Sequence, residues 1–99
     1  MKHVTFAEKS LLIGNEAADL LMQYARLISE RGGSDVVTVR AIGVDGNAVD
    51  ASFLLNSATV LMVESASTDA TEPDNHEAVE YLRNRTEELS QPFGPPSDL

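Results

Sequence analysis

The segment His76-Glu77-Ala78-Val79-Glu80 has spacing close to that of a metal site. In the pattern His-Glu-x-x-His, two imidazoles one helical turn apart bind zinc, and the glutamate acts as a general base. Here Glu80 replaces the second histidine, and His3 is the only other imidazole in the chain. His76 and Glu80 are therefore candidate metal ligands, but a histidine at the start of a helix is more often a solvated surface residue. We predict no dedicated metal site and no cofactor.

Other patterns that would support catalysis are missing from the sequence. The chain has no cysteine, which excludes thiolate nucleophiles, disulfides and iron–sulfur clusters. It contains no Gly-x-Ser-x-Gly elbow, no phosphate-binding glycine loop and no dinucleotide fingerprint. The oxygen ligands around residues 69–75 lack the alternating spacing of a calcium loop, and helix capping explains them. We predict a non-enzymatic protein with no catalytic residues.

The net charge of −9 is unevenly distributed along the chain. Residues 66–99 carry eight carboxylates and two arginines, a net charge of −6, whereas residues 1–33 are neutral. An acidic surface repels nucleic-acid phosphates and anionic membranes. The first residues also lack the apolar region of a signal peptide, and no apolar run reaches the roughly 18 residues that span a bilayer. These features predict a cytoplasmic protein that binds neither nucleic acid nor membranes.

Residues 36–63 predict three consecutive antiparallel strands, with β-branched residues alternating around glycine-containing turns. A two-residue Asp45-Gly46 loop would place Arg40 on the apolar face of the first hairpin. A three-residue loop, Asp45-Gly46-Asn47, pairs Val39 with Phe53, keeps one face apolar and brings Arg40 near Asp50. Because a slip of one residue inverts every side chain, burial favours the three-residue loop. The third strand is apolar on both faces, which predicts a covered or central position.

Two amphipathic helices flank these strands. The first is predicted from an N-cap at Asn15 to Gly32-Gly33, because apolar residues recur at helical spacing between these signals. The second is predicted to begin near Asp74 with Glu77 as a capping box, or alternatively at Thr71. Part of residues 3–13 is predicted to form another strand. Residues 91–99 contain three prolines and are predicted to be an extended or disordered tail.

The resulting order, β-α-β-β-β-α, predicts an α+β two-layer sandwich over residues 1–90, with a mainly antiparallel sheet and both helices on one face. The other sheet face is more apolar than a solvated surface requires. A two-fold homodimer is the simplest way to cover it, and scattered apolar residues on a monomer are the alternative. The predicted interface residues are Arg40, Ile42, Val44, Asp50 and Leu54. The sequence therefore predicts a protein-interaction or regulatory domain, and the alternative is an acidic mimic that occupies a basic nucleic-acid-binding partner.

Three resemblances accompany these predictions. Leu12-Ile13-Gly14-Asn15-Glu16-Ala17-Ala18 resembles the segment leading into the first helix of the histidine phosphocarrier family. Ile13 stands where that family has its phosphorylated histidine and Asn15 where it has an arginine, so the resemblance does not imply carrier activity. The predicted element order resembles the ribosome-hibernation family, whose RNA-binding helices are basic, unlike those here. Residues 5–14 and 51–56 resemble small acidic bacterial proteins with no assigned activity.

Overall fold

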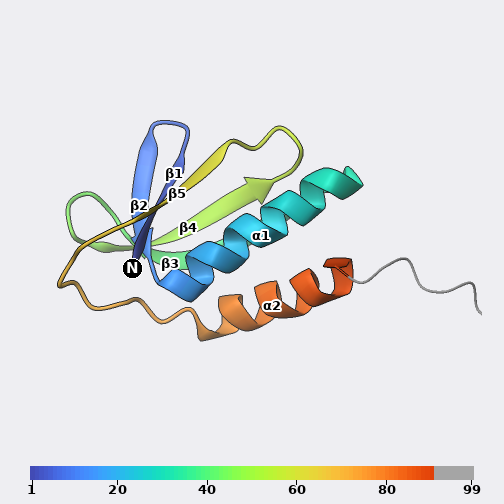
Figure 1. Cartoon of the computed structure of the whole chain (residues 1–99). Helices are drawn as coiled ribbons and strands as arrows, with labels where there is room; N and C mark the ends of the chain where they lie inside the picture. Colours follow the sequence, from blue (N-terminus) through green and yellow to red (C-terminus); the bar gives the residue numbers. More distant parts are fainter. Residues whose placement is uncertain (91–99) are drawn as a thin grey trace, which may run out of the picture.

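The computed structural model describes residues 1–90 as one five-stranded antiparallel sheet with two helices, which confirms the α+β class (Figure 1). The strand order across the sheet is β4-β3-β2-β1-β5. The predicted tail at residues 91–99 lies outside the described residues. The elements are β1 (Lys2–Phe6), β2 (Lys9–Ile13), α1 (Asn15–Arg31), β3 (Asp35–Ile42), β4 (Ala48–Leu55), β5 (Leu61–Ser65) and α2 (His76–Ser90).

The N-terminal segment forms two strands instead of the single strand predicted. β1 and β2 pair from Lys2 opposite Ile13 to Phe6 opposite Lys9, and Ala7-Glu8 makes the turn. Ala7 has φ 56°, the left-handed conformation that a tight hairpin turn needs. Glycine or asparagine normally marks such a turn. Because neither is present here, the sequence gives no signal for the hairpin.

The β3–β4 hairpin has the predicted faces but a different register. The Gly43 N–H donates to the Asn47 carbonyl at 2.9 Å, which leaves Val44, Asp45 and Gly46 at the tip of the loop. The left-handed residue of the loop is Gly46, with φ 84°, because glycine adopts this conformation without a steric penalty. The strands are consequently shifted by two residues from the predicted pairing. Since a two-residue shift preserves the faces, Arg40 and Asp50 share a face as predicted, and the observed register places them directly opposite one another.

The third predicted strand does not continue the β3–β4 ladder. β5 pairs with β1 at the opposite edge of the sheet, with Val63 opposite Val4. The prediction of a covered or central strand is therefore wrong, since β5 is an edge strand with Met62 48% exposed. The N-terminal hairpin explains the difference, because it provides a strand, β1, with a free edge along which β5 pairs.

The sheet is strongly curled. Residues 56–60 connect its two edge strands, β4 and β5, and five residues span at most about 17 Å. β2 and β3 pair at a single position, Leu12 opposite Ile42, and the two hairpins diverge from there. The Phe6 ring on β1 lies 6.1 Å from the Phe53 ring on β4 in an edge-to-face contact. Strands separated by two others in the sheet order thus face one another across its concave side.

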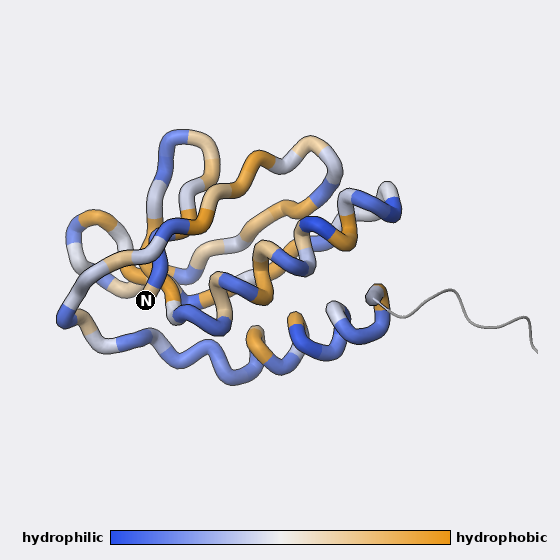
Figure 2. The backbone as a smooth tube through the Cα atoms, viewed as in Figure 1, coloured by the Kyte–Doolittle hydropathy of each residue, from blue (hydrophilic) through white to orange (hydrophobic). Residues whose placement is uncertain are grey.

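Helix α1 packs on this concave side and supplies much of the core. Its buried residues alternate with exposed polar residues along the helix, as predicted (Figure 2). Gly14, not Asn15, is the N-cap, and its carbonyl accepts a hydrogen bond from Ala18. Gly32 ends the helix in the left-handed conformation with φ 69°. The buried residues of α1 are Ala17, Ala18, Leu21, Tyr24, Ala25, Leu27 and Ile28.

Helix α2 runs beside α1 in the same direction (Figure 1). It begins at His76, two residues after the predicted start, and the Asp74 side chain accepts a hydrogen bond from the His76 N–H at 3.0 Å. The Asn75 side chain does not cap the helix. It accepts a hydrogen bond from the Arg40 N–H at 2.7 Å and donates one to the Arg40 carbonyl at 2.8 Å. The Asn75 side chain therefore pairs with backbone groups at the edge of β3, at a position beyond the end of β2. Leu82 is fully buried against the core.

Candidate functional site

The structure places four of the five predicted interface residues, Arg40, Ile42, Asp50 and Leu54, on the outer face of the β3–β4 hairpin. Arg40, Asp50 and Leu54 project from the outer face of the sheet, away from the helices, because alternate residues of a strand share a face. Leu54 is 52% exposed, whereas Ile42 on the same face is half-buried. Val44 lies at the tip of the loop and is 95% exposed, so it belongs to the loop and not to the outer face of the sheet.

Cross-strand pairs divide this outer face into apolar and polar parts. Val36, 58% exposed, lies directly opposite Leu54 and forms an apolar end that the sequence analysis did not include. The Thr38 and Ser52 hydroxyls share a hydrogen bond of 2.7 Å. The Arg40 guanidinium lies 3.4 Å from the Asp50 carboxylate. The charges of the face are therefore paired within the protein.

The candidate metal ligands do come together, but without further ligands. His76 Nε2 lies 3.3 Å from Glu80 Oε2, one helical turn away, and both side chains are largely exposed. Within residues 1–90, no group of three or more histidine, cysteine, aspartate or glutamate side chains is arranged to hold a metal ion. The arrangement is that of an ordinary i,i+4 surface pair.

A cluster of polar residues that the sequence analysis missed joins α1, β3 and α2. The Tyr24 hydroxyl donates to Asp35 Oδ2 at 2.5 Å, and the Tyr81 hydroxyl donates to the same oxygen. Arg85 Nε donates to the Tyr24 hydroxyl at 3.3 Å, and the Asp35 carboxylate also accepts from the Val36 N–H at 2.7 Å. Tyr24 lies on the predicted apolar face of its helix, but its partners come from other elements, so no local pattern reveals the cluster.

The electrostatics of this cluster favour an ionised carboxylate between two neutral phenols. Burial acts to raise the pKa of Asp35, but the hydrogen bonds from Tyr24, Tyr81 and the Val36 N–H outweigh it and lower the pKa below its ordinary value. Burial and the adjacent Asp35 raise the pKa of Tyr24. Neither group is therefore set up to exchange a proton near neutral pH. The cluster is suited to holding α2 in place and not to acid–base catalysis.

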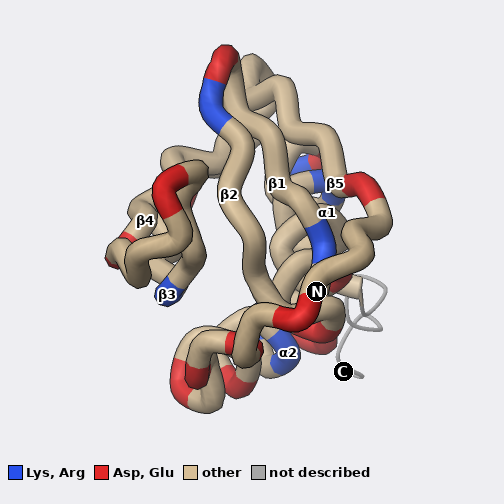
Figure 3. Tube along the Cα trace, turned by 90° about the vertical axis from the view of Figure 1, so that its left-hand side faces the viewer, with Lys and Arg blue, Asp and Glu red and all other residues tan. Residues whose placement is uncertain are grey.

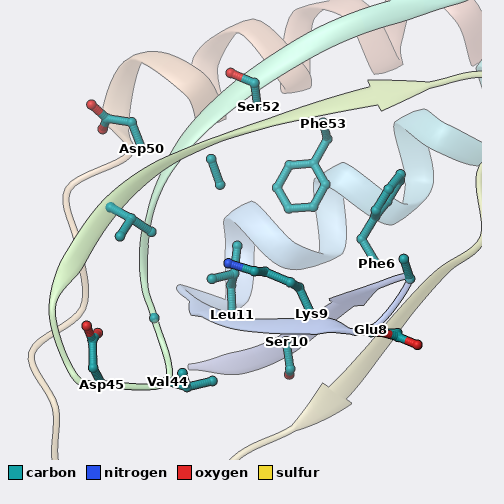
Figure 4. Close-up of a pocket in the computed structure, with 14 residues that line it drawn as sticks. Phe6, Glu8, Lys9, Ser10, Leu11, Val44, Asp45, Asp50, Ser52 and Phe53 are labelled. Atoms are coloured by element: carbon teal, nitrogen blue, oxygen red, sulfur yellow. The ribbon is translucent and has the colours of Figure 1, made fainter.

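A groove of about 710 Å³ lies between the tips of the two hairpins (Figure 4). The rings of Phe6 and Phe53 form one part of its wall, together with Leu11, and the Lys9 side chain extends into it. Its volume is within the range of small-ligand pockets. The groove is a consequence of the curled sheet, so the sequence contained no direct signal for it.

Acidic residues gather on α2 and on the segment leading to it (Figure 3). Both arginines of α2 are paired, Arg83 with Glu16 of α1 and Arg85 with Glu88 at 3.2 Å. The exposed carboxylates here are those of Asp69, Glu72, Asp74, Glu77, Glu80, Glu87 and Glu88. This surface is therefore more acidic than the outer sheet face, where Arg40 and Asp50 balance one another.

No helix within residues 1–90 is both long enough and apolar enough to cross a membrane. No protein-family model, curated protein or solved structure matches this chain.

Proposed function

We propose that this chain is a non-enzymatic protein-interaction domain that forms a two-fold homodimer through the outer face of the β3–β4 hairpin. The observation that supports this proposal is the exposure of Val36 and Leu54, which lie directly opposite one another and are each more than half exposed. An isologous contact would place this pair against the same patch of a second copy and remove it from water. Because Arg40 already pairs with Asp50, the contact would not bring unpaired like charges together.

Replacing Leu54 with arginine should convert the dimer to a monomer without unfolding the domain. The side chain is outside the core, but in the dimer the substitution would bury two unpaired charges. We expect the dissociation constant to rise by at least tenfold, as measured by light scattering after size exclusion over a range of protein concentrations.

Met62→Arg is the matched control, because Met62 is 48% exposed, close to the exposure of Leu54, and lies on β5 at the opposite edge of the sheet. This variant should remain dimeric, and circular dichroism should show that both variants are folded. A wild-type protein that stays monomeric at high concentration would contradict the proposal. A Leu54→Arg protein that remains dimeric would show that the interface lies elsewhere.

The acidic surface along α2 supports a second candidate, a mimic that occupies the basic groove of a nucleic-acid-binding protein. Such binding should weaken steeply with salt, because exposed charges are screened within about 8 Å at physiological ionic strength. A basic nucleic-acid-binding domain used as a probe should be retained on immobilised protein at low salt and released as salt rises. Replacing Glu77 and Glu87 with glutamine should reduce its retention. Retention that does not change with salt would contradict this candidate.

A further inference from the structure

The free edge of β4 lies along the groove between the two hairpins. Within residues 1–90, β4 pairs only with β3, so the backbone groups on its other side have no strand partner. The residues lining the groove include five consecutive positions of β4, from Val49 to Phe53. Successive side chains of a strand point to opposite faces. A run of five lining residues therefore means that the groove follows the strand's edge and not just one of its faces.

Hydrogen bonds at both ends of the hairpin show which backbone groups point outward. The Gly43–Asn47 bond makes these residues a hydrogen-bonded pair, and such pairs alternate along an antiparallel ladder. Val49, Ala51 and Phe53 therefore direct their N–H and C=O groups toward β3. The backbone groups of Asp50, Ser52 and Leu54 face the other way. The Leu54 carbonyl agrees with this assignment, since it accepts a hydrogen bond from the Thr59 hydroxyl at 2.8 Å.

We infer that this edge and groove bind an extended segment of a partner protein, which adds as a strand beside β4 and has a basic residue near one or both of its ends. Backbone hydrogen bonds to Asp50 and Ser52 would hold the segment, and alternate side chains would enter the groove. An apolar side chain would contact Phe6 and Phe53, which already pack edge to face. β4 contains no proline and one charged residue, Asp50, so it lacks most of the features that block strand addition.

The charges lining the groove favour a basic partner over a second copy of this acidic chain. Three carboxylates, those of Glu8, Asp45 and Asp50, line it with one ammonium group, that of Lys9. Since Asp50 is already paired with Arg40, Glu8 and Asp45 are the carboxylates that would attract a basic partner. Hydrogen bonds from the backbone and side chain of Asn47 lower the pKa of Asp45, which favours its ionised form. A lysine or arginine flanking the apolar side chain would reach these carboxylates. If the β4 edges of two copies paired so that Asp50 of one lay opposite Asp50 of the other, two carboxylates would instead be brought together.

Selection from a random library of ten-residue peptides displayed on phage tests this inference. We expect enrichment of sequences in which apolar residues alternate with polar ones and a lysine or arginine lies near an end. The enriched sequence is then made as a labelled synthetic peptide, and its affinity is measured by fluorescence anisotropy. Selection that yields no enrichment over an empty support, or that yields acidic sequences, would overturn the proposal.

Ser52→Pro is the decisive variant. Proline removes the one N–H that points into the groove at this position and leaves the ladder with β3 intact, so an edge strand tolerates it. Ser52→Ala is its control, because it removes the hydroxyl bonded to Thr38 but keeps the N–H. The proline variant should bind the selected peptide at least tenfold more weakly, whereas the alanine variant should bind within a factor of two of the wild type. Equal binding by all three proteins would overturn the proposal.

Two further measurements keep the inference testable if Ser52→Pro fails to fold. Methylating alternate backbone nitrogens of the peptide should weaken binding to the wild-type protein to a similar extent, and unchanged affinity would count against strand addition. Amide exchange of Asp50 and Ser52 is measured without peptide in the Leu54→Arg variant, in which the proposed dimer should be absent. It should not depend on protein concentration, since protection that rises with concentration would show a second copy on this edge. This inference shares with the proposed function only the premise of an interaction domain. The dimer is tested at Leu54 and the groove at Ser52, so the failure of one is distinguishable from the failure of the other.

Discussion

Replacing Leu82 with alanine should lower the free energy of unfolding by about 2–5 kcal/mol, the range observed for buried leucines. Leu82 is fully buried and is the one large apolar side chain of α2 that is inaccessible to solvent. Its removal would leave a cavity between α2 and the rest of the core, and α2 has few other buried residues to hold it. Urea denaturation followed by circular dichroism would measure the loss.

Leu89→Ala is the control for this prediction, because Leu89 lies on the same helix but is only partly buried. The smaller burial should make its effect clearly smaller than that of Leu82→Ala. Hydrogen exchange would locate the change, since amides of α2 should lose protection before those of α1. If both leucine variants lost the same stability, or if Leu82→Ala changed it by less than about 0.5 kcal/mol as a surface substitution does, this account of α2 packing would be wrong.

Replacing Asp35 with alanine should destabilise the protein by about 1–3 kcal/mol, because the fully buried Tyr24 would lose the acceptor of its hydroxyl group. The same carboxylate receives the Tyr81 hydroxyl, so the substitution would also remove a contact between α2 and β3. Asp19→Ala is the control, since that carboxylate makes an exposed ion pair with Lys2. Exposed pairs contribute about 0–1 kcal/mol, so the two variants should differ in urea denaturation.

The Asp35 cluster also gives stability a defined pH dependence. The pKa of Asp35 is lowered in the folded protein, so its contribution is complete above the unfolded value of about 3.9 and is lost as pH falls through the folded pKa. The pKa of Tyr24 is raised, so its contribution is complete below its unfolded value of about 10 and is lost as pH rises through the folded pKa. In Asp35→Ala, denaturation curves measured below pH 4 should show a weaker dependence on pH. If the loss of stability below pH 4 were the same in Asp35→Ala as in the wild type, other carboxylates would account for that loss.

The sequence by itself determined most of the local structure. The apolar and polar faces of α1 were predicted because a helix repeats its faces every few residues, and the glycines after Arg31 marked its end. The requirement that one face be buried also predicted the inner and outer faces of the β3–β4 hairpin correctly. The loop itself was predicted at residues 45–47 and lies one residue earlier, at 44–46. In α2, the residues that pack on the core recur at the same helical spacing, and they are Ala78, Val79, Leu82 and Leu89.

The pairing of distant elements was decided only by the tertiary structure. The residues of β5 form a strand in either arrangement, but whether β5 joins β4 or β1 depends on competition between sheet edges, and the β1–β2 hairpin changed that competition. The curl that brings Phe6 to Phe53, and with it the groove, follows from this order. The side chains of Asp35 and Asn75 likewise bind partners 11 to 46 residues away. Local periodicity specifies which face of an element is buried, whereas the partner across the core depends on the free energy of the whole arrangement.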